Sequence, residues 1–440
     1  MIEIYEPEIE VIAELGSDDM SPEDLIVYGA YSTIKKETSK KLKMRDVENE
    51  KVEYRRERLL NVTLESGHLS VLDQAVFSIY ISNIPRLATL FMVQPIYLSH
   101  LQQSMRRVEP YGIYLPNSLR RRDIISLAEE SINLYYRMVD GGIPKEDARY
   151  VIPLYTVTNI QSVGNAREYT HLYLLSKLDG IPTICRDIVE NLIHKISEKY
   201  PRIFHNYGEN YNILKYYPMP NMFRFKKIIV DGLAEKGRTP RLLGYSNFIE
   251  LDERDLYNAL KERDYSYLMQ LRNITYTILV KMSLSAFHQA LRQRTLKHIP
   301  ESIYHALTRF DITIPPSINR SRYREEYLAM VKKLYKKYLE LIGEGVKPED
   351  AVGIVSHSHN IYDVVNLDGW NIVGSLPTRR CIKAQWEIRR VVGDLMKEVR
   401  KLGNPLPIFS LPGCITFGKC PEKYPCEYKE EFEARGPLIK

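Results

Sequence analysis

The chain has 440 residues, of which 44% are hydrophobic and 27% are charged, so it is too apolar to be intrinsically disordered and is long enough for two or three hydrophobic cores. It contains no run of about 18 uncharged apolar residues, and residues 1–6 have neither the basic start nor the apolar centre of a signal peptide, so we expect a soluble, cytoplasmic protein. The 62 basic and 56 acidic residues leave a net charge of +6, which favours anionic ligands only weakly.

The first half alternates between strand and helix patterns. Polar and apolar residues alternate over 8–15 and predict a strand, and Ser21-Pro22-Glu23-Asp24 has the form of a capping box, which predicts the start of a helix. Residues 76–84 have the β-branched and aromatic alternation of a strand, and the apolar spacing becomes helical over 86–93. Longer amphipathic patterns predict helices over 120–139 and 181–200.

A further helix start is predicted at Ser99, because Gln102 follows three residues later as in a capping box. Ser104 and Arg106 would then lie in the first two turns of that helix. Free N–H groups and the positive end of the helix dipole make such a start suitable for a phosphate group. The segment is therefore a candidate phosphate site.

The second half repeats this order of elements. Residues 206–225 contain several Pro and Met residues and are the best linker candidate. A strand over 228–233, a helix over 253–263, an apolar segment over 274–284 and a long helix over 324–343 follow.

The repeat has a consistent register. Ser104 set on Ser302 gives an offset of 198, and Ala148 set on Ala351 gives 203, so one insertion of five residues separates two otherwise collinear halves. We predict a mixed α/β protein with two homologous domains in tandem, 1–215 and 216–440, each a β-sheet with packed helices.

One stretch in the second half carries the clearest chemistry. Arg292-Gln293-Arg294 places two guanidinium groups around one polar residue, and Ser302 follows after seven intervening residues. At the equivalent place the first half has Gln94-Pro95-Ile96 and then Ser104, so it lacks both charges. Arginine suits nucleotide phosphates because its planar donors bind their oxygens in pairs. The second half is therefore the better candidate for binding a pyrophosphate at this loop.

Five segments together resemble the flavin-dependent thymidylate synthases, the ThyX family. That family carries Arg-His-Arg, seven residues and Ser, and later Ala-Gln-Trp-Glu-Ile-Arg. Residues 292–302 match the first signature except for the central His, and residues 384–389 match the second completely. In the first half, residues 67–70, 102–106 and 148–154 resemble three further family segments. The resemblance covers nearly the whole chain.

The resemblance implies a fold and a reaction. The fold is a mixed α/β domain that assembles as a tetramer with active sites between subunits. The reaction is the reductive methylation of dUMP to dTMP, with FAD as cofactor, NADPH as reductant and methylene-tetrahydrofolate or a related pterin as carbon donor.

The resemblance also assigns roles residue by residue. In the family the Arg-His-Arg segment holds FAD, while the serine and the following arginine hold the nucleotide phosphate. The candidate cofactor-binding residues are therefore Arg292, Gln293, Arg294, His68 and Asn165, and the candidate substrate-binding residues are Ser104, Arg106, Gln102, Arg149, Gln289 and Arg379. No residue is assigned a catalytic role, since hydride delivery by the flavin makes a serine nucleophile unnecessary in the family.

The two halves are complementary in what they keep. The first half keeps Ser104 and Arg106, while the second keeps the flavin arginines but has Tyr304 where a phosphate arginine belongs. We expect one competent site that combines first-half and second-half residues, and a homodimer that reproduces the tetramer of the family. Ser302 is then not expected to contact the nucleotide.

Departures from the family pattern leave two other functions open. Gln293 replaces the central His, and Lys383 stands where a His is common. The chain would then be a diverged flavin- and nucleotide-binding paralogue that alkylates another pyrimidine, or a non-catalytic binding or assembly protein. No Gly-x-Gly-x-x-Gly follows a predicted strand, and basic residues do not interleave with aromatic ones, so neither a dinucleotide fold nor a nucleic-acid partner is expected.

The five cysteines include three that are evenly spaced near the end of the chain, Cys414, Cys420 and Cys426. Three thiolates would hold zinc or an iron–sulfur cluster if Cys381, a histidine or another chain supplied a fourth ligand. The spacing lacks the close Cys-x-x-Cys pair of such sites, so a disulfide or plain buried thiols are favoured. The abundant Lys, Arg, Glu, Ile and Tyr are typical of a thermophile, and hyperthermophiles do form intracellular disulfides.

Overall fold

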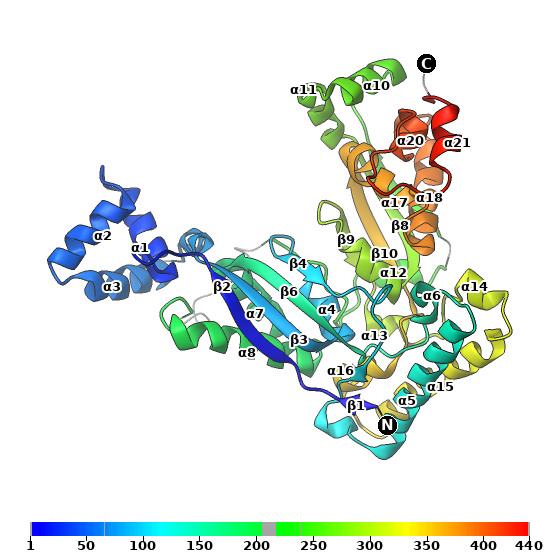
Figure 1. The fold of residues 1–440 in the computed structure, drawn as a ribbon, viewed down its shortest axis with the longest axis horizontal. Coiled ribbons are helices and arrows are strands. Elements are labelled where there is room, and N and C mark those ends of the chain that lie inside the picture. The colour runs from blue at the N-terminus through cyan, green and yellow to red at the C-terminus, as the bar shows by residue number, and fades with distance from the viewer. Residues whose placement is uncertain (1, 66, 205–216, 238, 439–440) are drawn as a thin grey trace. The chain divides into compact units, whose positions relative to one another are not determined.

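The computed structural model describes residues 2–65, 67–204, 217–237 and 239–438 (Figure 1). The chain forms two compact units: the first contains Met1–Met219 and Pro316–Ser356, and the second contains Pro220–Pro315 and His357–Lys440. The predicted boundary between residues 215 and 216, and over half of the predicted linker, lie outside the described residues. Residues 316–356 come from the second half of the sequence but group with the first unit.

The first unit is built on a four-stranded antiparallel sheet in the order β2–β3–β6–β4. Its strands are β2 (Glu8–Glu14), β3 (Val76–Pro85), β6 (Val157–Asn165) and β4 (Ser99–Gln102). Every second side chain of β3 is buried from Phe77 to Ile81, which confirms the strand predicted from the alternation. The helix α8 (Thr183–Lys199) packs against β2 and against α7 (Ala166–Ser176).

The second unit repeats this sheet in the order β7–β8–β10–β9, again antiparallel throughout. Its strands are β7 (Arg241–Ser246), β8 (Thr275–Ser283), β10 (Asn360–Asp368) and β9 (Lys297–Pro300). The first residues of β4 and β9 are 198 apart, and those of β6 and β10 are 203 apart. These are the two offsets found in the sequence, so the tandem pair of related α/β folds is confirmed.

In both sheets the second strand runs directly into a short buried helix. In the first unit β3 leads into α4 (Arg86–Met92), all of whose residues are buried. In the second unit β8 leads into α12 (Leu284–Ala290), where the side chain of Ser283 accepts a hydrogen bond from the Ala286 N–H. The change from strand to helix at residue 86 was predicted from the change in apolar period. These two junctions carry the polar side chains described below.

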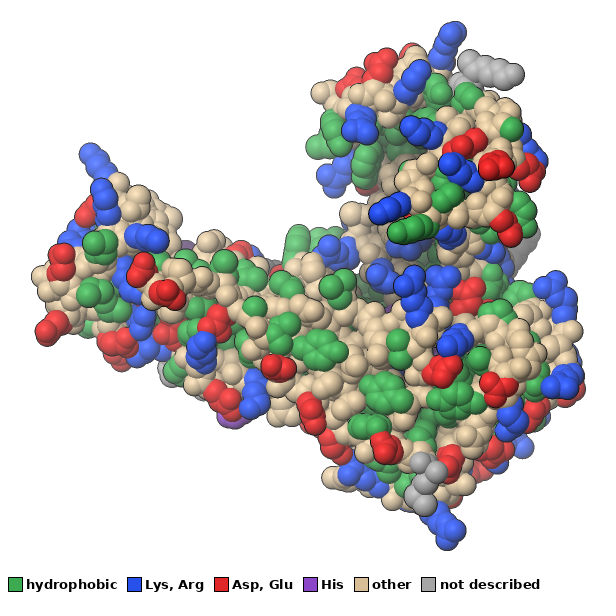
Figure 2. Space-filling view, viewed as in Figure 1, with side chains coloured by type: hydrophobic (Ala, Val, Ile, Leu, Met, Phe, Trp, Pro, Cys, Tyr) green, Lys and Arg blue, Asp and Glu red, His purple; other side chains and the backbone are tan. Residues whose placement is uncertain are grey.

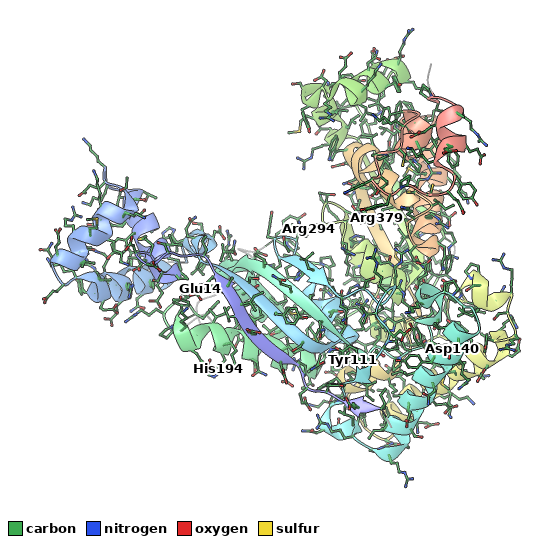
Figure 3. The ribbon with its side chains drawn as sticks, viewed as in Figure 1. Glu14, Tyr111, Asp140, His194, Arg294 and Arg379 are labelled. Atoms are coloured by element: carbon green, nitrogen blue, oxygen red, sulfur yellow. The ribbon has the colours of Figure 1, made fainter. Side chains whose placement is uncertain are left out.

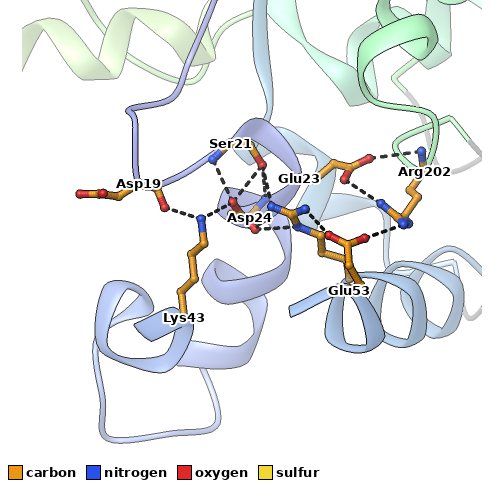
Figure 4. Close-up of polar contacts among 8 residues, drawn as sticks. Asp19, Ser21, Glu23, Asp24, Lys43, Glu53 and Arg202 are labelled. Carbon is orange, nitrogen blue, oxygen red and sulfur yellow. Dashed lines mark hydrogen bonds and ion pairs between the residues drawn. The ribbon is translucent and has the colours of Figure 1, made fainter. Parts of the chain in front are cut away.

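Three helices lie between β2 and β3 in the chain: α1 (Pro22–Ser32), α2 (Ser39–Glu48) and α3 (Val52–Glu65). The predicted capping box at Ser21 and Asp24 is present. Asp24 is fully buried and pairs with Lys43 and Arg56, each at 2.7 Å (Figure 4). Although burial alone raises the pKa of Asp24, hydrogen bonds from Lys43, from Ser21 and from Arg56 lower it below its usual value. The ion network ties α1 to α2 and α3.

The surface of these three helices is mixed. Figure 2 shows hydrophobic side chains among basic and acidic ones over this part of the chain, and Met44, Val47 and Tyr54 are more than half exposed. Scattered exposed apolar residues are ordinary for a protein surface.

A long helix from each half packs together within the first unit. These are α5 (Arg122–Asp140) and α15 (Arg324–Gly343), both predicted from their amphipathic patterns. Ion pairs join them, among them Lys337 with Asp123 at 3.3 Å. Nearby, the Leu154 N–H donates to the Val355 carbonyl at 2.9 Å. These contacts explain why residues 316–356 group with the first unit.

Two of the predicted elements are wrong. Residues 99–102 form the strand β4 rather than the start of a helix, because they pair with β6 in the sheet. Residues 228–233 were predicted as a strand but contribute to α9 (Ile229–Ala234), which begins where the Asp231 carboxylate accepts the Ile228 N–H at 2.7 Å. In each case a short apolar or polar pattern was ambiguous, and pairing or capping decided it.

The remaining elements are mostly short. They are β1 (Glu3–Ile4), β5 (Gly112–Ile113), α6 (Lys145–Ala148), α10 (Glu253–Glu262), α11 (Tyr265–Met269), α13 (Ile303–Ala306), α14 (Pro316–Asn319), α16 (Pro348–Ala351), α17 (Pro377–Arg380), α18 (Trp386–Arg400), α19 (Leu406–Phe409), α20 (Gly413–Thr416) and α21 (Lys429–Ala434), with the 3-10 turns η1 (Leu69–Gln74), η2 (Asn117–Leu119), η4 (Gln270–Asn273) and η5 (Val352–Ile354) and a π turn η6 (Asn371–Ser375). Among the described residues, no helix combines the length and apolar character needed to cross a membrane.

Candidate nucleotide and cofactor site

Two buried arginines lie close together in the first unit. Arg86 is the first residue of α4, directly after β3, and Arg149 is the residue that ends α6. Each is only 6% exposed. Nε of Arg86 and Nη2 of Arg149 are buried and have no hydrogen-bond partner among the described residues. The Nε of Arg149 donates to the Glu146 carbonyl at 3.1 Å.

The electrostatics of this pair are unfavourable without an anion. Burial, and secondarily the charge of Arg149, lower the pKa of Arg86 to about 9. Burial also lowers the pKa of Arg149, and the nearby Tyr150 and Glu146 offset this only in part. Buried charges in proteins are normally paired and hydrogen-bonded. Two like charges with unused donors therefore form a preorganised binding place for an anion.

Among the predicted substrate residues, Arg106 is linked to this pair, and Ser104 and Gln102 precede it in the chain. Arg106 forms an ion pair with Glu146 at 2.6 Å, and the Glu146 carbonyl is also the acceptor for Arg149. Ser104 is exposed, and its Oγ accepts the Arg106 N–H at 3.3 Å. Gln102 ends β4, and its Nε2 is buried without a hydrogen-bond partner among the described residues. The fold thus brings Arg106 and Arg149 together through Glu146, at the end of a strand rather than in the predicted helix.

Arg86 was not among the residues proposed from the sequence. The signal was present, because Arg86 is the only charged residue in a run, 84–93, that is otherwise apolar apart from Thr89. A charged residue in a helix that is buried on all sides needs a partner, and none follows from local spacing.

The remaining first-unit candidates have other contacts. The side chain of Asn165 caps α7 by accepting the Glu168 N–H at 2.9 Å. Two residues after Asn165, Arg167 pairs with Asp73 at 3.3 Å. His68 is exposed and precedes η1 without making a side-chain cap. The Asn165 oxygen therefore has a structural use, while His68 is open to solvent.

In the second unit, the arginine stretch forms the loop between α12 and β9 (Figure 3). Arg379 lies on α17, and the Gln293 amide oxygen, when it faces Arg379, accepts hydrogen bonds from both Nε and Nη2 at 2.5 Å. Burial lowers the pKa of Arg379, and the charge of Arg292 lowers it further. The glutamine that replaces the family His therefore holds Arg379 beside a second cation. Gln289, one turn before the loop, donates from Nε2 to the Ser285 carbonyl at 3.3 Å.

The second family signature, residues 384–389, stabilises the helix α12 that leads into this loop. The Gln385 side chain caps α18 by accepting the Glu387 and Ile388 N–H groups. Glu387 is fully buried and accepts both the N–H and the hydroxyl of Ser283, at 3.0 and 2.6 Å. Since Ser283 in turn caps α12, the signature fixes the helix that ends at the arginine loop.

Ser302 has a structural role. It is fully buried, its N–H donates to Asp231 at 2.9 Å and its hydroxyl donates to the Arg224 carbonyl. Both of its polar groups are thus used inside the fold. Ser302, the serine of the first family signature, is therefore not available to a ligand in this arrangement, whereas Ser104 is exposed.

Comparisons with known proteins place these features in a family. The model of the family described as thymidylate synthase complementing protein matches residues 15–202 and 250–403, one segment in each half. A flavin-dependent thymidylate synthase of Sulfurisphaera tokodaii is 30% identical over 177 residues, which are 39% of this chain and 67% of that protein. The enzyme of the same name from Saccharolobus solfataricus is 31% identical over 151 residues, 33% of this chain and 58% of that protein.

A solved structure is more distant. The UMP/dUMP methylase PolB from Streptomyces cacaoi, bound with 5-Br dUMP, is 17% identical with a TM-score of 0.38 and covers 46% of this chain and 95% of its own. The family model, in contrast, matches 188 and 154 residues of the 440, well over half of the chain. The chain therefore belongs to the thymidylate synthase complementing protein family.

Proposed function

We propose that the protein is a flavin-dependent thymidylate synthase-like enzyme that methylates dUMP reductively to dTMP. The observation that carries the proposal is the buried pair Arg86 and Arg149, whose unused donors fit a nucleotide phosphate. Family membership and the names of the relatives support the same reaction class. Arg106, Gln102 and Ser104 complete the nucleotide end, with hydrogen-bonding groups around the two buried charges.

We further propose that FAD is held by the second set of arginines. Arg292 and Arg379 lie close enough for their charges to interact, and Gln293 orients Arg379. This donor set fits a phosphate-bearing cofactor, since clustered arginines are costly to bury without an anion. Bound FAD supplies the hydride of the reduction, with NADPH as the proposed reductant and methylene-tetrahydrofolate or a related pterin as the carbon donor. His68 and Arg294 are the further cofactor contacts that the family pattern suggests.

The two units then have different tasks in one reaction. The first unit provides nucleotide-binding residues, and the second provides flavin-binding residues but keeps its own serine, Ser302, inside the fold. We also propose that the working assembly is a homodimer. Light scattering should then give about twice the 51.4 kDa of one chain, and a monomer at working concentrations would contradict the assembly.

The test uses purified full-length protein. A flavin absorption band should be present, and tritium should be released from 5-labelled dUMP when NADPH and methylene-tetrahydrofolate are supplied. Arg149→Met should weaken dUMP binding by about 10- to 100-fold, because a hydrogen bond to a charged group contributes about 1.5–3 kcal/mol. Flavin content should not change in this variant.

The matched control is Arg137→Met on α5, where Arg137 is half exposed and pairs with Glu326. Its dUMP affinity should equal that of the unchanged protein. Flavin without tritium release from dUMP, but with turnover of another uridine nucleotide, would replace dUMP as the substrate. Absence of both flavin and nucleotide binding would overturn the enzymatic proposal.

A further inference from the structure

Four of the five cysteines lie in one part of the second unit. Cys381 follows α17 directly, Cys414 is the second residue of α20, and Cys420 and Cys426 lie between α20 and α21. In Figure 1 the helices α17, α18, α20 and α21 occupy the same end of this unit. All four side chains are partly exposed free thiols. The sequence had pointed to three of them and had favoured a disulfide or buried thiols.

Backbone and side-chain contacts bring the four segments together. Arg380, next to Cys381, donates to the Ser410 hydroxyl at 2.7 Å, which ties the end of α17 to the turn before α20. The Cys420 N–H donates to the Glu433 carboxylate on α21 at 2.8 Å. The Cys426 carbonyl accepts the Lys429 N–H at 3.2 Å, at the start of α21. The helices α20 and α21 also pack on each other.

The chain returns on itself between Cys414 and Cys420. The Lys419 N–H donates to the Gly413 carbonyl at 3.4 Å, and the Phe417 N–H donates to the same carbonyl at 2.8 Å. Gly413 also lies against Pro421, which would be 3.6 Å from a β-carbon at residue 413. Gly413, the residue before Cys414, therefore contacts the residues on both sides of Cys420.

The electrostatics of Cys414 agree with this arrangement. Cys420, Cys381 and Cys426 each lie close enough to Cys414 for their charges to interact with its thiol. A metal is the positive charge that clustered thiolates accept, and binding it removes their protons.

We propose that Cys381, Cys414, Cys420 and Cys426 hold one thiophilic metal centre through four thiolates. Each thiol exchanges its S–H bond for a metal–sulfur bond and releases a proton to solvent. A single zinc ion requires all four sulfurs about 2.3 Å from one point. Within the described part of the chain, no three His, Cys, Asp or Glu side chains stand together as a ligand group for one ion. An iron–sulfur cluster takes its four thiolates at separate irons and so fits a wider set of cysteines.

The test is a metal and sulfide analysis of full-length protein purified without oxygen and then reconstituted with iron and sulfide. Iron and acid-labile sulfide are measured because flavin contributes to neither. About four of each per chain are expected. Cys414→Ser and Cys420→Ser should each lower both values at least tenfold. The matched control is Cys185→Ser, which removes a buried thiol on α8 in the first unit and should leave both values unchanged.

Circular dichroism and gel filtration establish that each variant is folded. About one zinc per chain, without sulfide and lost in the Cys414→Ser variant, would keep the four-thiolate site and overturn the cluster. The site itself is overturned if neither metal binds after reconstitution, or if folded Cys414→Ser and Cys185→Ser variants retain the same amount of metal. It is also overturned if mass spectrometry finds disulfides among the four cysteines in protein purified without oxygen.

Discussion

Replacing Arg86 by methionine should make the ligand-free protein more stable and the nucleotide complex weaker. Arg86 is buried at the start of α4, its Nε has no partner among the described residues, and its charge faces that of Arg149. Methionine has a similar length and fills irregular apolar space without a charge. The change therefore removes an unfavourable charge from the empty site and removes one phosphate contact from the occupied site.

The magnitude follows from the pKa of Arg86. A decrease from 12.5 to about 9 corresponds to roughly 5 kcal/mol against the charged form, at 1.36 kcal/mol per unit. Relaxation and water reduce such figures, and replacement of buried charges by apolar residues stabilises proteins by up to about 4 kcal/mol. We expect a gain of about 1–4 kcal/mol in the free energy of unfolding. The loss of one charge-assisted contact should raise the dissociation constant for dUMP about 10- to 100-fold.

Urea denaturation with and without dUMP measures both effects. A ligand at 100 times its dissociation constant stabilises the folded state by about 2.7 kcal/mol. At that concentration the unchanged protein should show this stabilisation, and Arg86→Met, whose dissociation constant is 10- to 100-fold higher, should show only about 0.4–1.4 kcal/mol. Arg137→Met should behave like the unchanged protein in both conditions. If Arg86→Met is less stable without ligand, and dUMP stabilises it as much as the unchanged protein, Arg86 has an ordinary structural role and the reasoning fails.

Three further outcomes are expected. Asp24→Asn should lose about 3–5 kcal/mol in the free energy of unfolding at neutral pH, because it removes the buried carboxylate that two partly buried cations share. Glu53→Gln at an exposed pair should lose less than about 1 kcal/mol. Because the pKa of Asp24 is lowered in the folded state, its contribution should be present above pH 3.8 and should be lost as the pH falls below that value, and a loss on raising the pH instead would contradict the assignment. Glu387→Ala should cost about 1–3 kcal/mol by leaving the buried Ser283 N–H unsatisfied, and thermal unfolding should show it; an unchanged melting temperature would mean that another acceptor replaces the carboxylate. Ser104→Ala should weaken dUMP binding with little change in stability, while Ser302→Ala should lower stability and leave the affinity of the folded protein unchanged; equal loss of binding from both would refute the division between the halves.

Local patterns in the sequence were sufficient for most of the fold. The strands over β2 and β3 and the helices α1, α5, α8, α10 and α15 were predicted from apolar period and capping residues, because these features act over a few neighbouring residues. The duplication was also readable, since two offsets align the halves and recur in the strands. The resemblance then proposed Arg106, Arg149 and the arginine loop as binding residues. All of these depend on spacing along the chain.

Contacts between distant residues decided the rest. Residues 99–102 form a strand because they pair with β6. Residues 316–356 belong to the first unit because α15 packs against α5. Arg86 became a candidate only when the fold buried it beside Arg149, 63 positions later, where Glu146 offsets the charge of Arg149 only in part. Ser302 is not available to a ligand because its N–H donates to Asp231 and its hydroxyl donates to the carbonyl of residue 224. Burial and hydrogen bonding are properties of the folded chain, because both depend on which distant segments pack together. No local sequence pattern specifies which segments do so.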